Sequence, residues 1–519
     1  MIRVRSLSVL LALALPLCAF TSRVQAQEKD AKAGEKSADT PSAPPKEESS
    51  VTDHTIKIGG QTIPYKATAS TILIKNDKDE PTALIYSTAY TRSDAKDMSQ
   101  RPIAFLYNGG PGSSSVWLHM GSVGPRRVMT INADVTPPAP YKLMDNPDCL
   151  LDKTDLVFLD PVGTGFSHAV GKAQDKDFWG VDQDVKSLAQ FIATYVSRNN
   201  RWNSPKFLIG ESYGTFRNAA LANYLQGHDN MYLNGIVMVS SVLDLGTISF
   251  YPALDLGYVL YLPSYAATAW FHKTLKDRPE NLNAFLEEAR KFARGEYADA
   301  LMKGDALTAA EKTETAKKMA RFTGLSEDYL VKTNLRVRLF RFMQELQRNR
   351  GLTTGRLDAR FAGPTYDLIG EAADYDPQET AISGAFIGAF NTYIREELKF
   401  GQDKSYKPAA EFGGNRWDWK HEGSDFGFFP GSPSVVLDLV QAMVSNPRLK
   451  VEFEDGIYDL ATPFMEVEYT ADHMGLPENI RKNIRQQYYE AGHMMYLHDE
   501  DLAKLKKNVA SFIDSTTKQ

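Results

Sequence analysis

A serine flanked by two glycines is the first feature of this 519-residue chain that could do chemistry. Residues 210–214 read G-E-S-Y-G, after the short apolar run 206–209 and before a helical run at 216–225. Glycines around a serine between a strand and a helix permit a strained turn that pushes the hydroxyl toward a substrate. Chance alone gives about 0.1–0.2 such patterns in a chain of this length, so an ordinary glycine turn is the alternative. The strand and helix around the pattern favour Ser212 as a nucleophile.

A nucleophilic serine needs a base, because its hydroxyl is weakly reactive at neutral pH, and an acid must hold that base. The histidines that follow Ser212 are His228, His272, His421, His473, His493 and His498. The first of them comes too soon after the serine, and the next two fall in a predicted insertion. Among the last three, we favour His493, because Gly492 places it in a loop just before the final predicted helix. Any single histidine can equally be structural.

The acid is expected between the serine and the histidine in the chain. Asp459 follows the strand-like run 450–453 and a turn that reads G-I-Y at 456–458. This order places Asp459 on a loop beyond the carboxyl end of a strand, and we favour it as the acid. Asp455, closer to the same run, is the rival.

A glycine-rich loop at 108–112, N-G-G-P-G, follows the apolar run 102–107. Glycines let the backbone approach a substrate carbonyl, so that amide N–H groups form an oxyanion hole. A phosphate-binding loop or a plain turn would look similar, but neither a Walker lysine nor a G-x-G-x-x-G motif after a strand accompanies it. The acidic run H-D-E-D at 498–501 is more typical of a helix start than of a metal site. We therefore expect no metal and no cofactor.

Short apolar runs alternate with helical stretches and would position these residues. The runs 102–107, 155–159, 206–209 and 235–239 are typical of buried parallel strands, and 181–197 has helical periodicity. β-rich runs at 54–58 and 70–75 predict antiparallel strands that open the sheet. The pattern predicts an α/β-hydrolase fold, with a mainly parallel central sheet flanked by helices. Its core would comprise 51–242 and 433–519, with a last helix at about 501–513.

Residues 243–432 differ in character and predict an inserted helical lid. An aromatic cluster opens this region, and strongly helical segments follow it. One helix is expected to begin at Thr308, because Glu311 three residues later completes a capping box.

The N-terminus predicts export. Arg3 and Arg5 precede an apolar run at 7–20 that is too short for a membrane span. We expect a signal peptide at 1–26, cleaved near Ala26, although Cys18 offers a poor lipoprotein alternative. Residues 27–50 are polar and predict a disordered leader. Cleavage changes the formal net charge from −6 to −9, which excludes a basic surface for nucleic acid. No later stretch predicts a membrane span, so a secreted or periplasmic protein is expected.

Together these segments resemble the serine carboxypeptidase family. The resemblance rests on N-G-G-P-G-S-S at 108–114, D-P-V-G-T-G-F-S at 160–167, G-E-S-Y-G at 210–214, Tyr458-Asp459 and A-G-H-M at 491–494. It implies an acyl-enzyme peptidase that releases C-terminal residues from peptides. It also implies a catalytic triad, an oxyanion hole and a site for the substrate's terminal carboxylate. The implied residues are respectively Ser212, Asp459 and His493; the backbone amides of Gly110 and Tyr213; and Asn108, Gly109 and Glu211.

Two positions depart from the family's pattern. The family usually has a second glutamate in an E-x-G-P segment, where this chain reads S-V-G-P at 122–125. Ser122 leaves the implied carboxylate network incomplete, and Arg126 or Arg127 could bind a carboxylate instead. The family's cysteine after Pro-Gly is Ser113 here, and only Cys149 remains beyond the signal peptide, which favours a bacterial-type member. Because a glutamate binds a carboxylate only when one of the two is protonated, we expect stronger peptide binding in acid.

Overall fold

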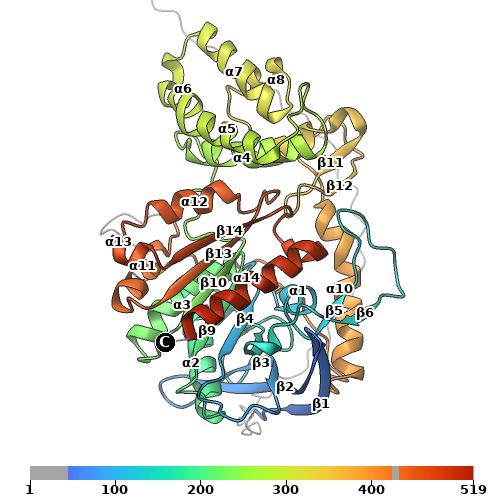
Figure 1. The fold of residues 1–519 in the computed structure, drawn as a ribbon, viewed down its shortest axis with the longest axis vertical. Helices are drawn as coiled ribbons and strands as arrows, with labels where there is room; N and C mark the ends of the chain where they lie inside the picture. Colours follow the sequence, from blue (N-terminus) through green and yellow to red (C-terminus); the bar gives the residue numbers. More distant parts are fainter. Residues whose placement is uncertain (1–44, 423–431, 518–519) are drawn as a thin grey trace, which may run out of the picture. The chain divides into compact units, whose positions relative to one another are not determined.

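A mixed β-sheet forms the centre of the computed structural model, which describes residues 45–422 and 432–517. The strand order is β1-β2-β3-β7-β4-β9-β10-β13-β14, and β8 pairs with β3 (Figure 1). Strands β1, β2, β3 and β7 pair in antiparallel fashion, whereas every neighbouring pair from β7 to β14 is parallel. The bounds are β1 Ser49–Ile58, β2 Gln61–Lys75, β3 Pro81–Arg92, β4 Ile103–Tyr107, β7 Asp155–Leu159, β8 His168–Ala169, β9 Lys206–Glu211, β10 Gly235–Val239, β13 Lys450–Gly456 and β14 Ile484–Tyr489.

Alternating side chains of the parallel strands supply the two hydrophobic cores on the faces of this sheet. In β4, Ala104 and Leu106 join one core, while Ile103, Phe105 and Tyr107 join the other. Strands buried on both faces therefore read as continuous apolar runs. Helices α1, α10 and α14 supply the first core, and α2, α3 and α11 supply the second. Their bounds are α1 Val116–Gly121, α2 Val181–Arg198, α3 Tyr213–Gly227, α10 Pro377–Glu396, α11 Val436–Ser445 and α14 Asp499–Thr517.

The predicted fold class is confirmed by this topology. The four predicted parallel strands correspond to β4, β7, β9 and β10, and the predicted antiparallel runs lie within β1 and β2. Strand β14 was not predicted, because its sequence I-R-Q-Q-Y-Y is polar and its residues are mostly half-buried at the sheet edge. Edge strands are not buried on both faces, so they lack the continuous apolar run from which central strands can be predicted.

The region predicted as an inserted lid divides into two parts. Helices α4–α9 pack around a third hydrophobic core, and Figure 1 shows α4–α8 gathered together. Residues 377–406, including α10, instead join the core on one face of the sheet, because Phe386, Phe390 and Tyr393 pack there. The bounds are α4 Leu256–Phe271, α5 Leu282–Phe292, α6 Ala298–Lys303, α7 Ala309–Thr323, α8 Glu327–Lys332, α9 Leu339–Glu345, β11 Leu352–Thr354 and β12 Ala362–Pro364.

The predicted capping box is present at the start of α7. The Thr308 hydroxyl accepts a hydrogen bond from the Glu311 amide, and the Glu311 carboxylate accepts one from the Thr308 amide at 2.8 Å. The remaining short elements are β5 Arg126–Val128, β6 Leu143–Asp145, α12 Phe464–Asp472 and α13 Glu478–Arg481.

The predicted signal peptide and most of the predicted leader lie outside the described residues. Residues 45–50 are described, and they pack along the sheet. Glu47 pairs with Arg198 at 2.7 Å and Glu48 with Lys404 at 2.6 Å, while Ser49 begins β1. Residues 45–50, which were assigned to the predicted leader, thus pack on the folded core. Among residues 45–422 and 432–517, no helix has the length and apolarity needed to cross a membrane.

Candidate active site

Ser212 occupies a strained turn between β9 and α3. Its backbone has φ 60° and ψ −129°, a left-handed region that disfavours residues with a side chain. The turn is possible because Gly210 and Gly214 approach closely: a Cβ on Gly210 would lie 2.2 Å from the Gly214 carbonyl oxygen. The Ser212 amide donates to the Val239 carbonyl at 3.0 Å, which fixes the turn on the neighbouring strand β10. The structure therefore exposes Ser212 on a rigid elbow beyond the carboxyl end of β9.

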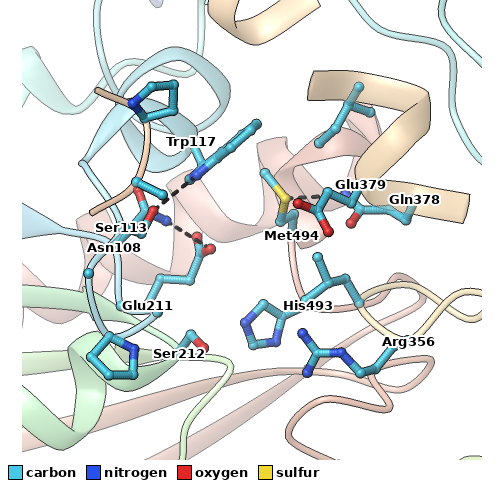
Figure 2. A pocket seen from close by; sticks show the side chains of 18 residues that line it. Asn108, Ser113, Trp117, Glu211, Ser212, Arg356, Gln378, Glu379, His493 and Met494 are labelled. Atoms are coloured by element: carbon cyan, nitrogen blue, oxygen red, sulfur yellow. Dashed lines mark hydrogen bonds between the residues drawn. The ribbon is translucent and has the colours of Figure 1, made fainter. Parts of the chain in front are cut away.

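His493 and Asp459 come together from two loops that follow β14 and β13. His493 Nδ1 donates to Asp459 Oδ2 at 2.7 Å, and both side chains are buried. The Asp459 carboxylate also accepts hydrogen bonds from the Ala461 and Thr462 amides and from the Thr462 hydroxyl. These contacts fix the histidine ring with Nε2 available for other partners. Ser212 and His493 line one pocket without a hydrogen bond between them in this structure (Figure 2).

The alternatives to these two residues lie elsewhere. The exposed His473 donates to the Tyr469 carbonyl, and His498 pairs with Asp501. Asp455 is buried in β13 and makes no hydrogen bond to His493. Of the three late histidines, the structure thus brings only His493 to the pocket of Ser212, and it is Asp459 that holds it.

The electrostatic surroundings of His493 favour its charged form. Burial lowers the pKa of His493, but the charge and hydrogen bond of Asp459 and the charge of Glu211 raise it further, so that the pKa lies above its ordinary value. The positive charge of Arg356 opposes this increase. An imidazolium formed by proton transfer from Ser212 would therefore be stabilised where it arises.

The glycine-rich loop at 108–112 packs directly against the turn that carries Ser212. A Cβ on Gly109 would lie 2.3 Å from the Tyr213 amide nitrogen, so only glycine fits there. Within the described chain, the amide N–H groups of Gly110 and Tyr213 donate to no protein acceptor. The contact brings the loop that carries Gly110 against the backbone of Tyr213, next to Ser212, and an oxyanion hole needs such unpaired donors close to the nucleophile.

Glu211 is a buried carboxyl group beside the nucleophile. Its Oε1 accepts from Asn108 Nδ2 at 2.9 Å, and its Oε2 accepts from the Tyr496 hydroxyl at 2.6 Å. Asn108 is itself oriented, because its Oδ1 accepts from the Leu118 amide at 2.9 Å. Burial raises the pKa of Glu211 to about 7, against the lowering effects of His493, Tyr496 and Asn108. The group is therefore protonated in acid and can then donate a hydrogen bond.

A pocket of about 270 Å³ joins these groups (Figure 2). Trp117, Ile382 and Met494 give it apolar walls, and Arg356 and Glu379 add charge. Among the described residues, no group of histidine, cysteine and carboxylate side chains has the arrangement of a metal site. The full lining comprises Asn108, Gly109, Gly110, Pro111, Gly112, Ser113, Trp117, Glu211, Ser212, Arg356, Leu357, Gln378, Glu379, Ile382, Pro408, Ala409, His493 and Met494.

Part of this chain matches a known family. Residues 65–296, which include the glycine-rich loop and the serine elbow, match the family model described as serine carboxypeptidase. Through this segment the chain is similar to the serine carboxypeptidase family.

Curated proteins of yeast and human are similar to part of this chain. It is 31% identical over 147 residues to the pheromone-processing carboxypeptidase KEX1 of Saccharomyces cerevisiae, over 27% of this chain and 19% of the relative. It is 30% identical over 129 residues to the retinoid-inducible serine carboxypeptidase of Homo sapiens, over 24% of this chain and 25% of the relative. The chain thus spans about a fifth to a quarter of the length of these relatives.

A solved structure of the same yeast carboxypeptidase, KEX1(delta)p, shares the fold. The TM-score is 0.55 at 16% sequence identity, over 87% of this chain and 91% of that chain. The similarity of fold therefore extends beyond residues 65–296, which the family model matches.

The structure also shows the contacts of Ser122. The Ser122 side chain is buried and donates to the Leu118 carbonyl of its own helix, away from Glu211. Arg126 and Arg127 do not line the pocket, because each pairs with acids elsewhere; the partners are Asp145, Glu397 and Asp499.

Two further residues of the site, one bonded to Glu211 and one in the pocket lining, were not predicted from the sequence. The Tyr496 hydroxyl donates a hydrogen bond to Oε2 of Glu211. Tyr496 lies three residues after His493, so its proximity to the base was the available signal. Arg356 lies in the predicted insertion, far from every motif, and no sequence signal pointed to it.

Proposed function

We propose that this chain is a serine-type carboxypeptidase that releases C-terminal amino acids from peptides through an acyl-enzyme on Ser212. The buried Glu211 beside the nucleophile carries the proposal. A carboxyl group with a pKa of about 7, next to Asn108 and open to the pocket, suits the terminal carboxylate of a peptide. A protonated Glu211 can donate to that carboxylate, which an ionised one would repel.

In this mechanism, the terminal carboxylate lies against Asn108, Gly109 and Glu211, which places the last peptide bond at Ser212. His493 takes the serine proton as the hydroxyl oxygen attacks the carbonyl carbon, and Asp459 orients the ring and stabilises its charge. The amides of Gly110 and Tyr213 would stabilise the oxyanion.

Collapse of the tetrahedral intermediate breaks the C–N bond. His493 then gives the proton to the leaving amine, and the released amino acid takes it away. A water molecule, deprotonated by the same histidine, attacks the acyl-enzyme and restores the Ser212 hydroxyl.

The test is to incubate the protein with a peptide mixture between about pH 4 and 8 and identify the products by mass. Amino acids that leave one at a time from the C-terminus support the proposal. Ser212→Ala should release none and should not react with a fluorophosphonate, whereas the wild type reacts. Equal labelling of both would point instead to a non-catalytic binding protein with this fold.

An esterase or acyltransferase with the same triad is the alternative, and Ser122 favours it. With serine in place of the family's second glutamate, one partner of the substrate carboxylate is missing. Water or another nucleophile can resolve the same acyl-enzyme. Ester cleavage or acyl transfer without release of C-terminal amino acids would select this alternative.

We also propose that the protein is exported, as residues 1–26 indicate. The mature protein would work in a periplasm or outside the cell. N-terminal sequencing of protein recovered from the producing cells should find a start near Gln27.

A further inference from the structure

Arg356 is a positively charged side chain in the pocket without a protein partner. It is half-buried and lines the pocket, and it makes no hydrogen bond or ion pair through its guanidinium within residues 45–422 and 432–517. Figure 2 shows the guanidinium pointing into the pocket beside His493. The nearby Arg360 differs, because Asp358 neutralises it at 2.6 Å.

The backbone of Arg356 is fixed by the residue that caps helix α10 and by the loop that follows Asp459. Its amide donates to Asp376 Oδ2, and its carbonyl accepts from the Leu460 amide, both at 3.0 Å. The next residue, Leu357, accepts from the His493 amide at 2.6 Å. Arg356 is thus attached to the residues that follow Asp459 and to His493 itself. Such an attachment suits a group that must meet the substrate in a fixed position.

The acids around the pocket do not neutralise this arginine. Glu211 is bound to Asn108 and Tyr496, and Asp459 is bound to His493. Glu379 lines the pocket from the first turn of α10, but it is exposed and forms no ion pair with Arg356. The five N–H donors of a guanidinium match a carboxylate in a bidentate pair. The pocket therefore offers a place for one more carboxylate.

Resting on the proposed function, we propose that Arg356 binds the side-chain carboxylate of the leaving residue, so that the enzyme prefers peptides ending in glutamate or aspartate. Asn108 and Glu211 would hold the terminal carboxylate. In Figure 2 these two residues lie across the pocket from Arg356, with His493 between. A substrate with a second carboxylate can engage both sites, since one pocket contains them.

The experiment compares kcat/KM at about pH 6 for N-blocked tripeptides that end in Glu or in its uncharged analogue Gln. The wild type should favour Glu by about 10-fold or more, as expected for a charge-assisted bidentate pair. Arg356→Met should bring the ratio to within about twofold of one, because neither peptide then meets the positive charge. Arg356→Lys should retain part of the preference, because lysine keeps the charge but loses the fork. Arg416→Met removes an exposed arginine that does not line the pocket, and it should keep the full ratio.

The Glu/Gln ratio isolates binding from indirect effects. Loss of Arg356 also raises the pKa of His493, but that change acts on both peptides alike. Equal rates for Glu and Gln in the wild type would overturn the proposal, as would a ratio that persists in Arg356→Met. A second pair of peptides, with Glu or Gln in the penultimate position and the same last residue, should give a ratio of kcat/KM values near one. A preference seen only there would refute the assignment to the leaving residue. If no peptide releases its C-terminal residue, the proposed function itself fails.

Discussion

Removing the Tyr496 hydroxyl should extend peptidase activity to higher pH. In the structure this hydroxyl donates to Glu211 Oε2 at 2.6 Å, with both side chains buried. The bond stabilises the ionised carboxylate and lowers the pKa of Glu211, which burial raises to about 7. A hydrogen bond to a charged group contributes about 1.5–3 kcal/mol, and 1.36 kcal/mol corresponds to one pH unit. In Tyr496→Phe the pKa of Glu211 should therefore rise by at least about one unit, so that its carboxyl group stays protonated to a higher pH.

The assay measures kcat/KM against pH for a peptide with a free C-terminus. A protonated Glu211 binds the substrate carboxylate, so activity falls as the pH rises through the pKa of Glu211. The midpoint of that alkaline fall should move upward by about one unit in Tyr496→Phe. Tyr489→Phe is the matched control, because its buried hydroxyl donates to the carboxylate of Glu454, which does not line the pocket. An unchanged midpoint in a folded Tyr496→Phe protein, or an equal movement in Tyr489→Phe, would refute the reasoning.

Four further outcomes are expected from the proposed mechanism. The peptidase should weaken above about pH 7, where Glu211 ionises, whereas cleavage of an ester without a free carboxylate should persist there; parallel profiles would contradict the role of Glu211. Both activities should fall in acid as His493 gains a proton. Asp459→Asn should lower kcat by about 10⁴-fold with little change in KM, because the histidine loses the acceptor that sets its tautomer; steady-state kinetics measure this, and a loss confined to KM would speak against it. Gly109→Ala should slow fluorophosphonate labelling by about 10²-fold or more, because its Cβ would displace the Tyr213 amide; labelling at the wild-type rate would show that the loop is not part of an oxyanion hole.

Much of the fold was predictable because its signals are local. The runs that became β4, β7, β9 and β10 are apolar on both faces, and each is bounded by turn residues. The elbow at Ser212 was also readable, since a positive φ between a strand and a helix requires close glycine neighbours. Strand β14 and the division of the inserted region into two parts could not be predicted from the sequence. Polar edge strands lack a pattern, and α10 joins the sheet core through contacts with residues far away in the chain.

By itself, the sequence determined the α/β architecture and the identity of the candidate nucleophile, because strand alternation and glycine turns act over a few residues. It narrowed the base to three histidines and the acid to two aspartates, favoured His493 and Asp459 from their loops, and the resemblance to a family implied the same two residues. The tertiary structure decided which side chains meet at the pocket. Tyr496 on Glu211 and the unpaired Arg356 both depend on loops that approach across hundreds of residues. Such contacts arise from packing between elements, which no local pattern encodes.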